Sequence, residues 1–262
     1  MITSVANQKV KQVVAWQGKA KERKKDNIFL VEGLKMFEEA PEKSVREVYI
    51  EETLLEKLER GSELLSKLER VGFEVVSSEV FKKMSDTQTP QGILAIVERP
   101  TYQFEELLKI EKPLFVVLED LQDPGNLGTI VRTGEGAGVS AVFMTKNTVD
   151  IYNPKTIRAT MGSIYRVPFT IVEDIEEAIM AMKKAGIRTF AAHLDGKDYY
   201  DSFSFREGTA FLIGNEGNGL KTSTANAADA YLKIPMEGQV ESLNAAIATS
   251  LLMYEAHRQR KG

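Results

Sequence analysis

The sequence predicts an α/β fold in two domains, the larger of which is built on a parallel sheet. Its 262 residues, 43% of them hydrophobic, suffice for one or two buried cores. Short apolar runs that suit strands alternate along the chain with stretches that suit helices. From Pro113 onward, runs such as Leu114–Leu118 are apolar at every position, which is typical of strands buried on both faces of a parallel sheet.

The first hundred residues predict the smaller domain. Strands are expected at residues 28–31, 45–50, 73–76 and 93–97, and helices at residues 7–17, 32–40, 52–71 with a break near Gly61, and 80–84. Arg99-Pro100-Thr101, followed by a polar helix to Ile110, forms the expected linker. The predicted domains are therefore residues 1–100 and residues 110–262.

The second domain has a regular alternation of strands and helices with short connections. Strands are expected at residues 114–118, 140–144, 169–172, 187–192, 210–213 and 231–234, and helices at residues 126–137, 154–161, 175–185 and 243–255. The glycines of residues 134–138 close the helix that starts at Asn126, so they indicate a helix C-cap and a turn. A dinucleotide-binding fingerprint would instead follow a strand and open a helix.

Composition excludes several classes of site. The chain has no cysteine, which rules out disulfides, a thiolate zinc site and a cysteine nucleophile. Only His193 and His257 supply imidazole, so no metal is expected. No stretch reaches the apolar length that spans a bilayer, and residues 1–5 lack the plan of a signal peptide. We expect a soluble cytoplasmic protein with no membrane partner.

Charge is unevenly distributed along the chain. The net charge of −4 argues mildly against general nucleic-acid binding, yet seven basic residues lie between Met1 and Ile28, against Glu22 and Asp26. Such a basic arm would steer phosphate groups locally. A solvated helix and turn explains the same residues equally well, so both interpretations stay open. Trp16, among apolar neighbours, is expected in a core, and His257, in a polar C-terminal tail, is expected to be solvated.

Three segments combine polar residues with glycine or proline at the ends of predicted elements. Asn126 suits a helix N-cap, and Arg132, six residues later, suits an exposed helix charge. The glycine-rich run 214–219 follows an apolar strand, at the end where parallel sheets form ligand crevices, although a plain tight turn also fits. Ser242 suits the N-cap of the last helix.

Residues 126–132, 214–219 and 234–245 resemble, in that order, the three motifs of the SpoU/TrmH family. These are knotted methyltransferases that move a methyl group from S-adenosylmethionine to a ribose 2′-hydroxyl of RNA. The resemblance covers about residues 114–256. Residues 29–33 and 89–92 are also similar to the L30e-like substrate-binding domain of many such enzymes. The resemblance to this family implies a trefoil-knotted catalytic domain, S-adenosylmethionine as cofactor, a homodimer and an RNA partner.

The two-domain plan looks like that of the members that modify 23S ribosomal RNA, since the tRNA members usually lack the N-terminal domain. A tRNA ribose methyltransferase, a catalytically silent RNA-binding protein and a base-methylating knotted enzyme are the alternatives. In a homodimer of this kind the knotted domains pair. The apolar stripe Leu243, Ile247, Leu251 and Tyr254 adds little to that expectation, because such a stripe is more typical of core.

The resemblance also assigns site residues. The catalytic residues that it implies are Asn126, Arg132, Glu216, Ser242 and Asn244. The cofactor-binding residues that it implies are Gly214, Asn215, Glu216, Gly219, Ile234, Met236 and Leu243. Arginine is often named the base in this family, but its pKa above about 12 makes deprotonation costly. We therefore expect Arg132 chiefly to clamp a phosphate or the developing alkoxide.

Overall fold

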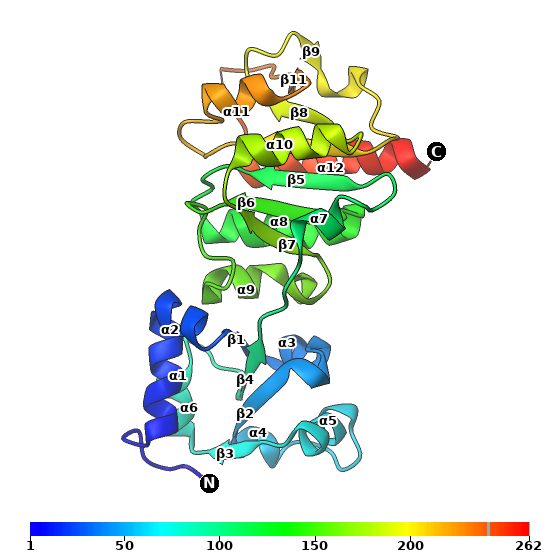
Figure 1. Cartoon of the computed structure of the whole chain (residues 1–262). Coiled ribbons are helices and arrows are strands. Elements are labelled where there is room, and N and C mark those ends of the chain that lie inside the picture. Colours follow the sequence, from blue (N-terminus) through cyan, green and yellow to red (C-terminus); the bar gives the residue numbers. More distant parts are fainter. Residues whose placement is uncertain (240–241, 262) are drawn as a thin grey trace. The chain divides into compact units, whose positions relative to one another are not determined.

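The computed structural model describes residues 1–239 and 242–261, which form two compact units (Figure 1). The first unit contains residues 1–100 and 150–165, and the second contains the rest. The sequence placed residues 150–165 in the second domain, whereas the structure groups them with the first unit. The reason is that residues 150–165 contact residues of the first unit that are far away in the sequence. The rings of Phe29 and Tyr152 lie 5.1 Å apart, and the Tyr165 hydroxyl donates to the carbonyl oxygen of Met36 at 2.9 Å.

The first unit is built on a four-stranded mixed sheet with the order β1-β4-β2-β3, in which only β2 and β3 are parallel. Its strands are β1 (Ile28–Glu32), β2 (Val45–Glu51), β3 (Glu74–Val76) and β4 (Ile93–Glu98). Its α-helices are α1 (Gln8–Gly18), α2 (Ala20–Lys25), α3 (Leu34–Glu39), α4 (Glu52–Leu55), α5 (Glu63–Val71), α6 (Ser78–Met84) and α9 (Pro154–Thr160). Trp16 is buried in the core of this unit, as expected from the sequence.

The second unit is built on a seven-stranded sheet with the order β7-β6-β5-β10-β8-β11-β9, in which every described pair is parallel. Its strands are β5 (Leu114–Leu118), β6 (Ala141–Thr145), β7 (Phe169–Val172), β8 (Arg188–Ala192), β9 (Asp198–Tyr199), β10 (Thr209–Ile213) and β11 (Ala230–Lys233). Its α-helices are α7 (Phe104–Leu107), α8 (Pro124–Ala137), α10 (Ile175–Lys184), α11 (Thr222–Ala227) and α12 (Ala245–Lys261).

Short 3₁₀ turns complete the described structure, at Glu42–Ser44, Ser163–Tyr165 and Tyr200–Ser202. Each strand predicted from the sequence is present within one or two residues of its expected bounds. The predicted break near Gly61, where φ is +82°, separates α4 from α5. The sequence did not predict α11 or β9, and α2 replaces the expected basic turn.

Helix α8 begins earlier than predicted. Asp123, not Asn126, is its N-cap, and the Asp123 carboxylate accepts a 2.8 Å hydrogen bond from the amide of Asn126. Pro124 occupies the first helical turn, where its fixed φ suits the helix and its missing N–H is not needed. The helix ends at Ala137 with Gly138 at φ +80°, which confirms that these glycines form a C-cap and turn.

Helix α12 is longer than predicted, and its C-terminal end is docked rather than free. The guanidinium of Arg260 donates to the carbonyl oxygens of Phe205, Pro113 and Glu207 at 2.7–3.0 Å. The expectation of a solvated His257 in a polar tail is therefore wrong. His257 is half-buried, and its Nδ1 lies 3.1 Å from the carbonyl oxygen of Ala137.

The apolar stripe on α12 also differs from expectation. Ile247, Leu251 and Tyr254 are 52%, 39% and 49% exposed, so they do not form core. The buried face of α12 instead carries Leu252 and Met253, and α12 packs against α8. Among the described residues, no helix has both the length and the apolar character needed to cross a membrane.

Candidate functional site

Several of the predicted site residues gather where two adjacent strands of the second unit end. Strands β5 and β10 pair in parallel, with Leu118 opposite Ile213. The residues after these strands therefore lie at one edge of the sheet, where α/β proteins form ligand crevices. Glu119 and Asp120 follow β5, and Gly214 follows β10.

The loop after β10 folds back on itself tightly. Asn215 and Gly219 exchange two backbone hydrogen bonds, of 3.0 and 2.9 Å. The side-chain oxygen of Asn215 accepts from the amides of Gly217 and Asn218 at 2.8 and 3.2 Å. A Cβ at Gly214 would lie 2.0 Å from the carbonyl carbon of Gly219, so only glycine fits there. The glycine-rich run is thus a close approach of two backbone segments.

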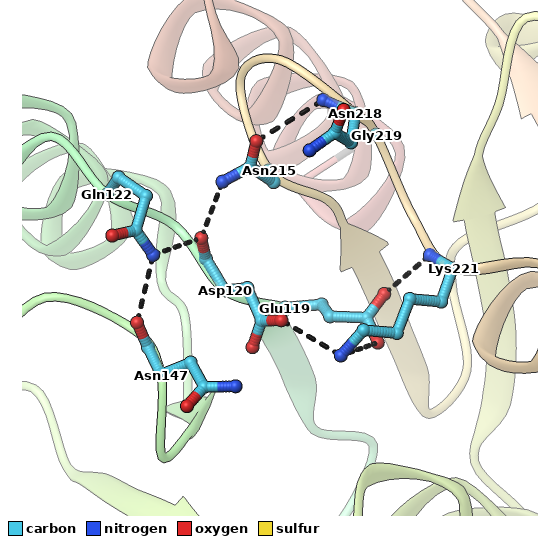
Figure 2. A pocket seen from close by; sticks show the side chains of 8 residues that line it. All are labelled: Glu119, Asp120, Gln122, Asn147, Asn215, Asn218, Gly219 and Lys221. Carbon is cyan, nitrogen blue, oxygen red and sulfur yellow. Dashed lines mark hydrogen bonds and ion pairs between the residues drawn. The ribbon is translucent and has the colours of Figure 1, made fainter.

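Two acidic residues after β5 hold this loop in place (Figure 2). Glu119, 1% exposed, accepts from the backbone amide of Lys221 at 2.8 Å and from the hydroxyl of Thr224 at 2.6 Å. The ammonium of Lys221 donates to the carboxylate of Asp120 at 2.8 Å. This hydrogen bond lowers the pKa of Asp120, against the opposing effect of burial, and the bond from Thr145 adds to it.

Asp120 also organises the edge through its backbone. Its φ is +54°, an uncommon value for a residue with a side chain. In that conformation its carbonyl oxygen accepts from the side-chain amides of Asn215, at 2.8 Å, and Gln122, at 2.7 Å. Gln122 donates as well to the carbonyl oxygen of Asn147 at 2.9 Å. The loops after β5, β6 and β10 are thereby joined.

Glu216 connects the loop after β10 to the start of α8. Its carboxylate accepts from the backbone amides of Gln122 and Asp123 and from the side-chain amide of Asn126, each at 3.0 Å. Burial acts to raise the pKa of Glu216, but these hydrogen bonds outweigh it and the pKa lies below its ordinary value. The carboxylate therefore stays ionised as an acceptor.

Asn244 brings the third predicted segment to the same place. Its side-chain oxygen accepts from the amides of Ala246 and Ile247, so Asn244, not Ser242, caps α12. Its side-chain amide donates to the side-chain oxygen of Asn126 at 3.0 Å. Asn126, Glu216 and Asn244 thus form one hydrogen-bonded set.

Other predicted residues are not part of this set. Arg132 is exposed on α8 and Ser242 is exposed before α12, and neither side chain makes a hydrogen bond or ion pair within residues 1–239 and 242–261. Ile234, Met236 and Leu243 are half-buried. Residues 240 and 241, which the sequence placed in the same motif, lie outside the described residues.

Two pockets open at this edge of the sheet. One, of about 320 Å³, is lined by Glu119, Asp120, Gln122, Asn147, Asn215, Asn218, Gly219 and Lys221 (Figure 2). The other, of about 460 Å³, is lined by Gln122, Asp123, Pro124, Asn215, Glu216 and Gly217. Both volumes fall in the range of small-molecule sites. Ile234, Met236 and Leu243 line neither pocket.

Sequence reasoning missed several of these residues. Glu119, Asp120 and Lys221 were not singled out, although two carboxylates directly after a fully apolar strand are a signal for the ligand edge of a parallel sheet. No local signal marks Asn147, because its place at the pocket follows from the pairing of β5 with β6.

Comparison with known proteins extends over both units. The SpoU rRNA Methylase family matches residues 113–254, and the MRM3-like substrate binding domain matches residues 7–95. Over 257 residues the chain is 34% identical to the 23S rRNA (guanosine(2553)-2′-O)-methyltransferase RlmP of Bacillus subtilis, with 97% of each protein covered.

Solved structures give the same result. The AdoMet-bound rRNA methyltransferase from Sinorhizobium meliloti has a TM-score of 0.85 at 30% identity, covering 98% of this chain and 97% of that one. The SpoU methyltransferase AviRb from Streptomyces viridochromogenes, in complex with the cofactor AdoMet, has a TM-score of 0.85 at 28% identity, covering 97% and 98%. These matches confirm the predicted α/β architecture of a parallel-sheet domain with a smaller N-terminal domain.

Proposed function

We propose that this chain, which belongs to the SpoU rRNA Methylase family, methylates a ribose 2′-hydroxyl of RNA with S-adenosylmethionine (AdoMet) as methyl donor. The observation that carries the proposal is the bonded set of Asn126, Glu216 and Asn244. It joins one residue from each of the three motif segments at one edge of the sheet.

We propose 23S ribosomal RNA as the substrate. The Bacillus subtilis relative, which matches nearly the whole chain, is a 23S rRNA 2′-O-methyltransferase by name. The match of residues 7–95 to a substrate-binding domain favours the same two-part plan here. A tRNA substrate, the alternative raised by the sequence, has no such support from the first unit. Intact Asn126, Glu216 and Asn244 argue against a silent RNA-binding protein.

The edge of the sheet fits the cofactor. Glycine at position 214 lets the loop after β10 fold back tightly on itself, and the two pockets lie beside this loop. When bound, AdoMet supplies an electrophilic methyl group on sulfur. The residues proposed to hold it are Gly214, Asn215, Glu216 and Gly219 from the loop after β10, with Ile234, Met236 and Leu243 from the segment after β11.

The remaining residues would position the RNA ribose and stabilise charge. Arg132 carries an exposed guanidinium, whose planar set of N–H donors suits an anion, so we propose that it clamps a substrate phosphate or the developing alkoxide. Glu216 fixes Asn126 through a charge-assisted hydrogen bond, and Asn244 fixes it from the other side. Asn126 is therefore oriented from two directions, and Ser242 precedes Asn244 by two residues along the sequence. Correct alignment of this kind lowers the activation free energy by several kcal/mol, on the order of 7–11 kcal/mol at most.

We propose further that the protein is a homodimer that pairs through α12. The exposed stripe Ile247, Leu251 and Tyr254 supports this, because contiguous exposed apolar side chains mark interaction surfaces. The trefoil knot expected from the family is also proposed, since the start of α12 returns to the start of α8 through Asn244. A cytoplasmic location is proposed because the proposed substrate, ribosomal RNA, is found there.

The test is methylation by the purified protein. Unmodified 23S ribosomal RNA and bulk tRNA are incubated separately with AdoMet, digested to nucleosides and compared by mass spectrometry. We expect one 2′-O-methylated nucleoside from 23S RNA and none from tRNA. A base-methylated nucleoside would contradict the proposed reaction, and a modified tRNA would contradict the proposed substrate. If the protein binds AdoMet and RNA but incorporates no methyl group, the result would favour a catalytically silent RNA-binding protein.

A further inference from the structure

The sheet of the first unit has two differently covered faces. Side chains alternate along β1, and Ile28 and Leu30 join a core cluster with α1 and α6. Phe29 points to the other face, where it contacts Tyr152 of the 150–165 segment. Figure 1 shows α1 and α6 together on one side of this unit, with α3 and α5 on the other.

The helices of the first face carry a strong positive charge. Residues 8–25, which form α1 and α2, contain seven lysine and arginine residues and one glutamate. Residues 34–71, which include α3–α5, contain seven basic and ten acidic residues. The chain as a whole has a net charge of −4. Positive charge is therefore concentrated on one face of an acidic protein.

Most of these cations have no intramolecular partner. We define the lysine face as seven exposed lysines on α1, α2, α6 and the residue between α1 and α2: Lys11, Lys19, Lys21, Lys24, Lys25, Lys82 and Lys83. Within residues 1–239 and 242–261 none of the seven side-chain ammonium groups makes a hydrogen bond or an ion pair. Elsewhere in the unit, Arg46, Arg70 and Arg158 pair with acidic side chains, and the unpaired cations there are fewer and lie among more acidic residues.

The remaining basic residue of α2 fixes this helix in place. Arg23 is 3% exposed and donates to the carbonyl oxygens of Trp16 and Gln17 at 2.7 and 3.1 Å. It also forms a 2.6 Å ion pair with Asp150. The indole of Trp16 donates to the carboxylate of Asp26, directly after α2, at 2.6 Å. The lysines of α2 therefore project from a helix that is held in place by Arg23 and by Asp26 directly after it.

We infer that the lysine face binds the phosphate backbone of the RNA substrate, an inference that rests on the proposed function and deepens it. Unpaired ammonium groups on a fixed helix pair attract a polyanion and release its counterions. Such contacts position an RNA without reading its sequence. The lysine face thus orients the RNA and does not select the nucleotide. The basic arm is a binding surface rather than a merely solvated helix.

Two matched triple variants test the inference in the full-length protein. Lys21→Gln/Lys24→Gln/Lys25→Gln removes three cations from the lysine face. Lys43→Gln/Lys57→Gln/Arg60→Gln removes three exposed, unpaired cations of the α3–α5 segment, outside the lysine face. Both variants change the net charge equally. Glutamine suits helices about as well as lysine, so α2 should fold, which thermal unfolding checks.

Binding of protein-free 23S ribosomal RNA is measured between 50 and 300 mM KCl. For the lysine-face variant we expect about tenfold weaker binding or more at 100 mM KCl. The slope of log affinity against log salt concentration should be shallower by about 2–3 for this variant, since each lost phosphate contact reduces the slope by about 0.7–0.9. The control variant should stay within about twofold of the wild type. Equal losses in the two variants would overturn the inference.

Methyl transfer separates this inference from the proposed function. If the wild-type protein methylates RNA, the lysine-face variant should show a raised KM for RNA with kcat and AdoMet affinity unchanged. An unchanged KM in an active enzyme refutes the lysine face alone. A wild-type protein that binds RNA in the manner expected but transfers no methyl group refutes the proposed function and leaves the lysine face standing.

Discussion

Asn244 donates a 3.0 Å hydrogen bond to the side-chain oxygen of Asn126, which lies 118 residues earlier in the chain. The same Asn244 side chain caps α12 through its oxygen, and the same Asn126 side chain donates to Glu216. The side-chain amide of Asn244 thus caps the first turn of α12 and also orients a proposed catalytic residue. These two tasks can be separated by substitution.

Substitution of Asn244 should divide stability from activity. Asn244→Asp keeps an oxygen that caps α12 but loses the donor to Asn126, so thermal stability should change little while methyl transfer falls by at least tenfold. Asn244→Ala loses both interactions and should also cost about 1 kcal/mol of unfolding free energy. Differential scanning calorimetry and kcat measurements check both. Full activity in Asn244→Asp would contradict the role of this bond.

Arg132 distinguishes an electrostatic clamp from a general base. If it clamps phosphate or alkoxide, Arg132→Ala should lower kcat by about 10²–10³, and Arg132→Lys should retain part of the activity with an unshifted pH profile. A rate that rises with the lower pKa of lysine would favour the base instead. Arg206→Ala, which removes another exposed and unpaired arginine of the same unit, is the control and should leave kcat unchanged.

The glycine loop gives a matched pair of substitutions. A Cβ at Gly214 would lie 2.0–2.4 Å from backbone atoms of Gly219 and Leu220, which cannot move freely. Gly214→Ala should therefore cost roughly 1–3 kcal/mol of unfolding free energy or more and abolish AdoMet binding. Gly217→Ala meets only a side-chain oxygen of Asn215 at 3.5 Å, an ordinary contact. Calorimetric titration of AdoMet should find near-normal affinity in Gly217→Ala; comparable losses in both variants would refute the close-approach argument.

The exposed stripe of α12 predicts the assembly state. Ile247→Glu/Leu251→Glu should convert the proposed dimer to a monomer, because two charges would be buried at its interface without partners. Ile171→Glu/Met180→Glu alters two equally exposed apolar residues outside the stripe and should remain dimeric. Sedimentation velocity measures both, and a wild-type monomer at micromolar concentration would exclude the dimer.

The acid response should follow Asp120 and Glu216. The pKa of each carboxyl is lowered in the folded protein, so each contributes stability above its ordinary pKa of about 4, and this is lost as pH falls through the lowered value. Stability should thus be nearly flat from pH 8 to about 5. Lys221→Met removes the hydrogen bond that chiefly lowers the pKa of Asp120. The loss of stability in acid should therefore begin at higher pH in this variant. Lys197→Met, at an exposed and unpaired lysine, is the control in thermal unfolding from pH 3 to 8; identical profiles would contradict the assignment.

Local signals predicted the strands well but placed two helix starts wrongly. The predicted start of α8 at Asn126 overlooked Asp123-Pro124, an N-cap and first-turn pair visible in the sequence. The last helix was placed too early, because the amide of Asn244 rather than the hydroxyl of Ser242 reaches the first free N–H groups. Several residues compete for each cap, and backbone geometry decides between them.

The sequence by itself determined the alternation of strands and helices, the parallel sheet and the three motif segments, because these depend on periodicity and neighbouring residues. Only the tertiary structure decided that Asn126, Glu216 and Asn244 are bonded, and that Glu119, Asp120 and Lys221 support the loop after β10. Those contacts depend on which strand ends share an edge of the sheet. The same holds for α12. Its sequence pattern shows an apolar stripe, but packing of the opposite face against α8 leaves that stripe exposed.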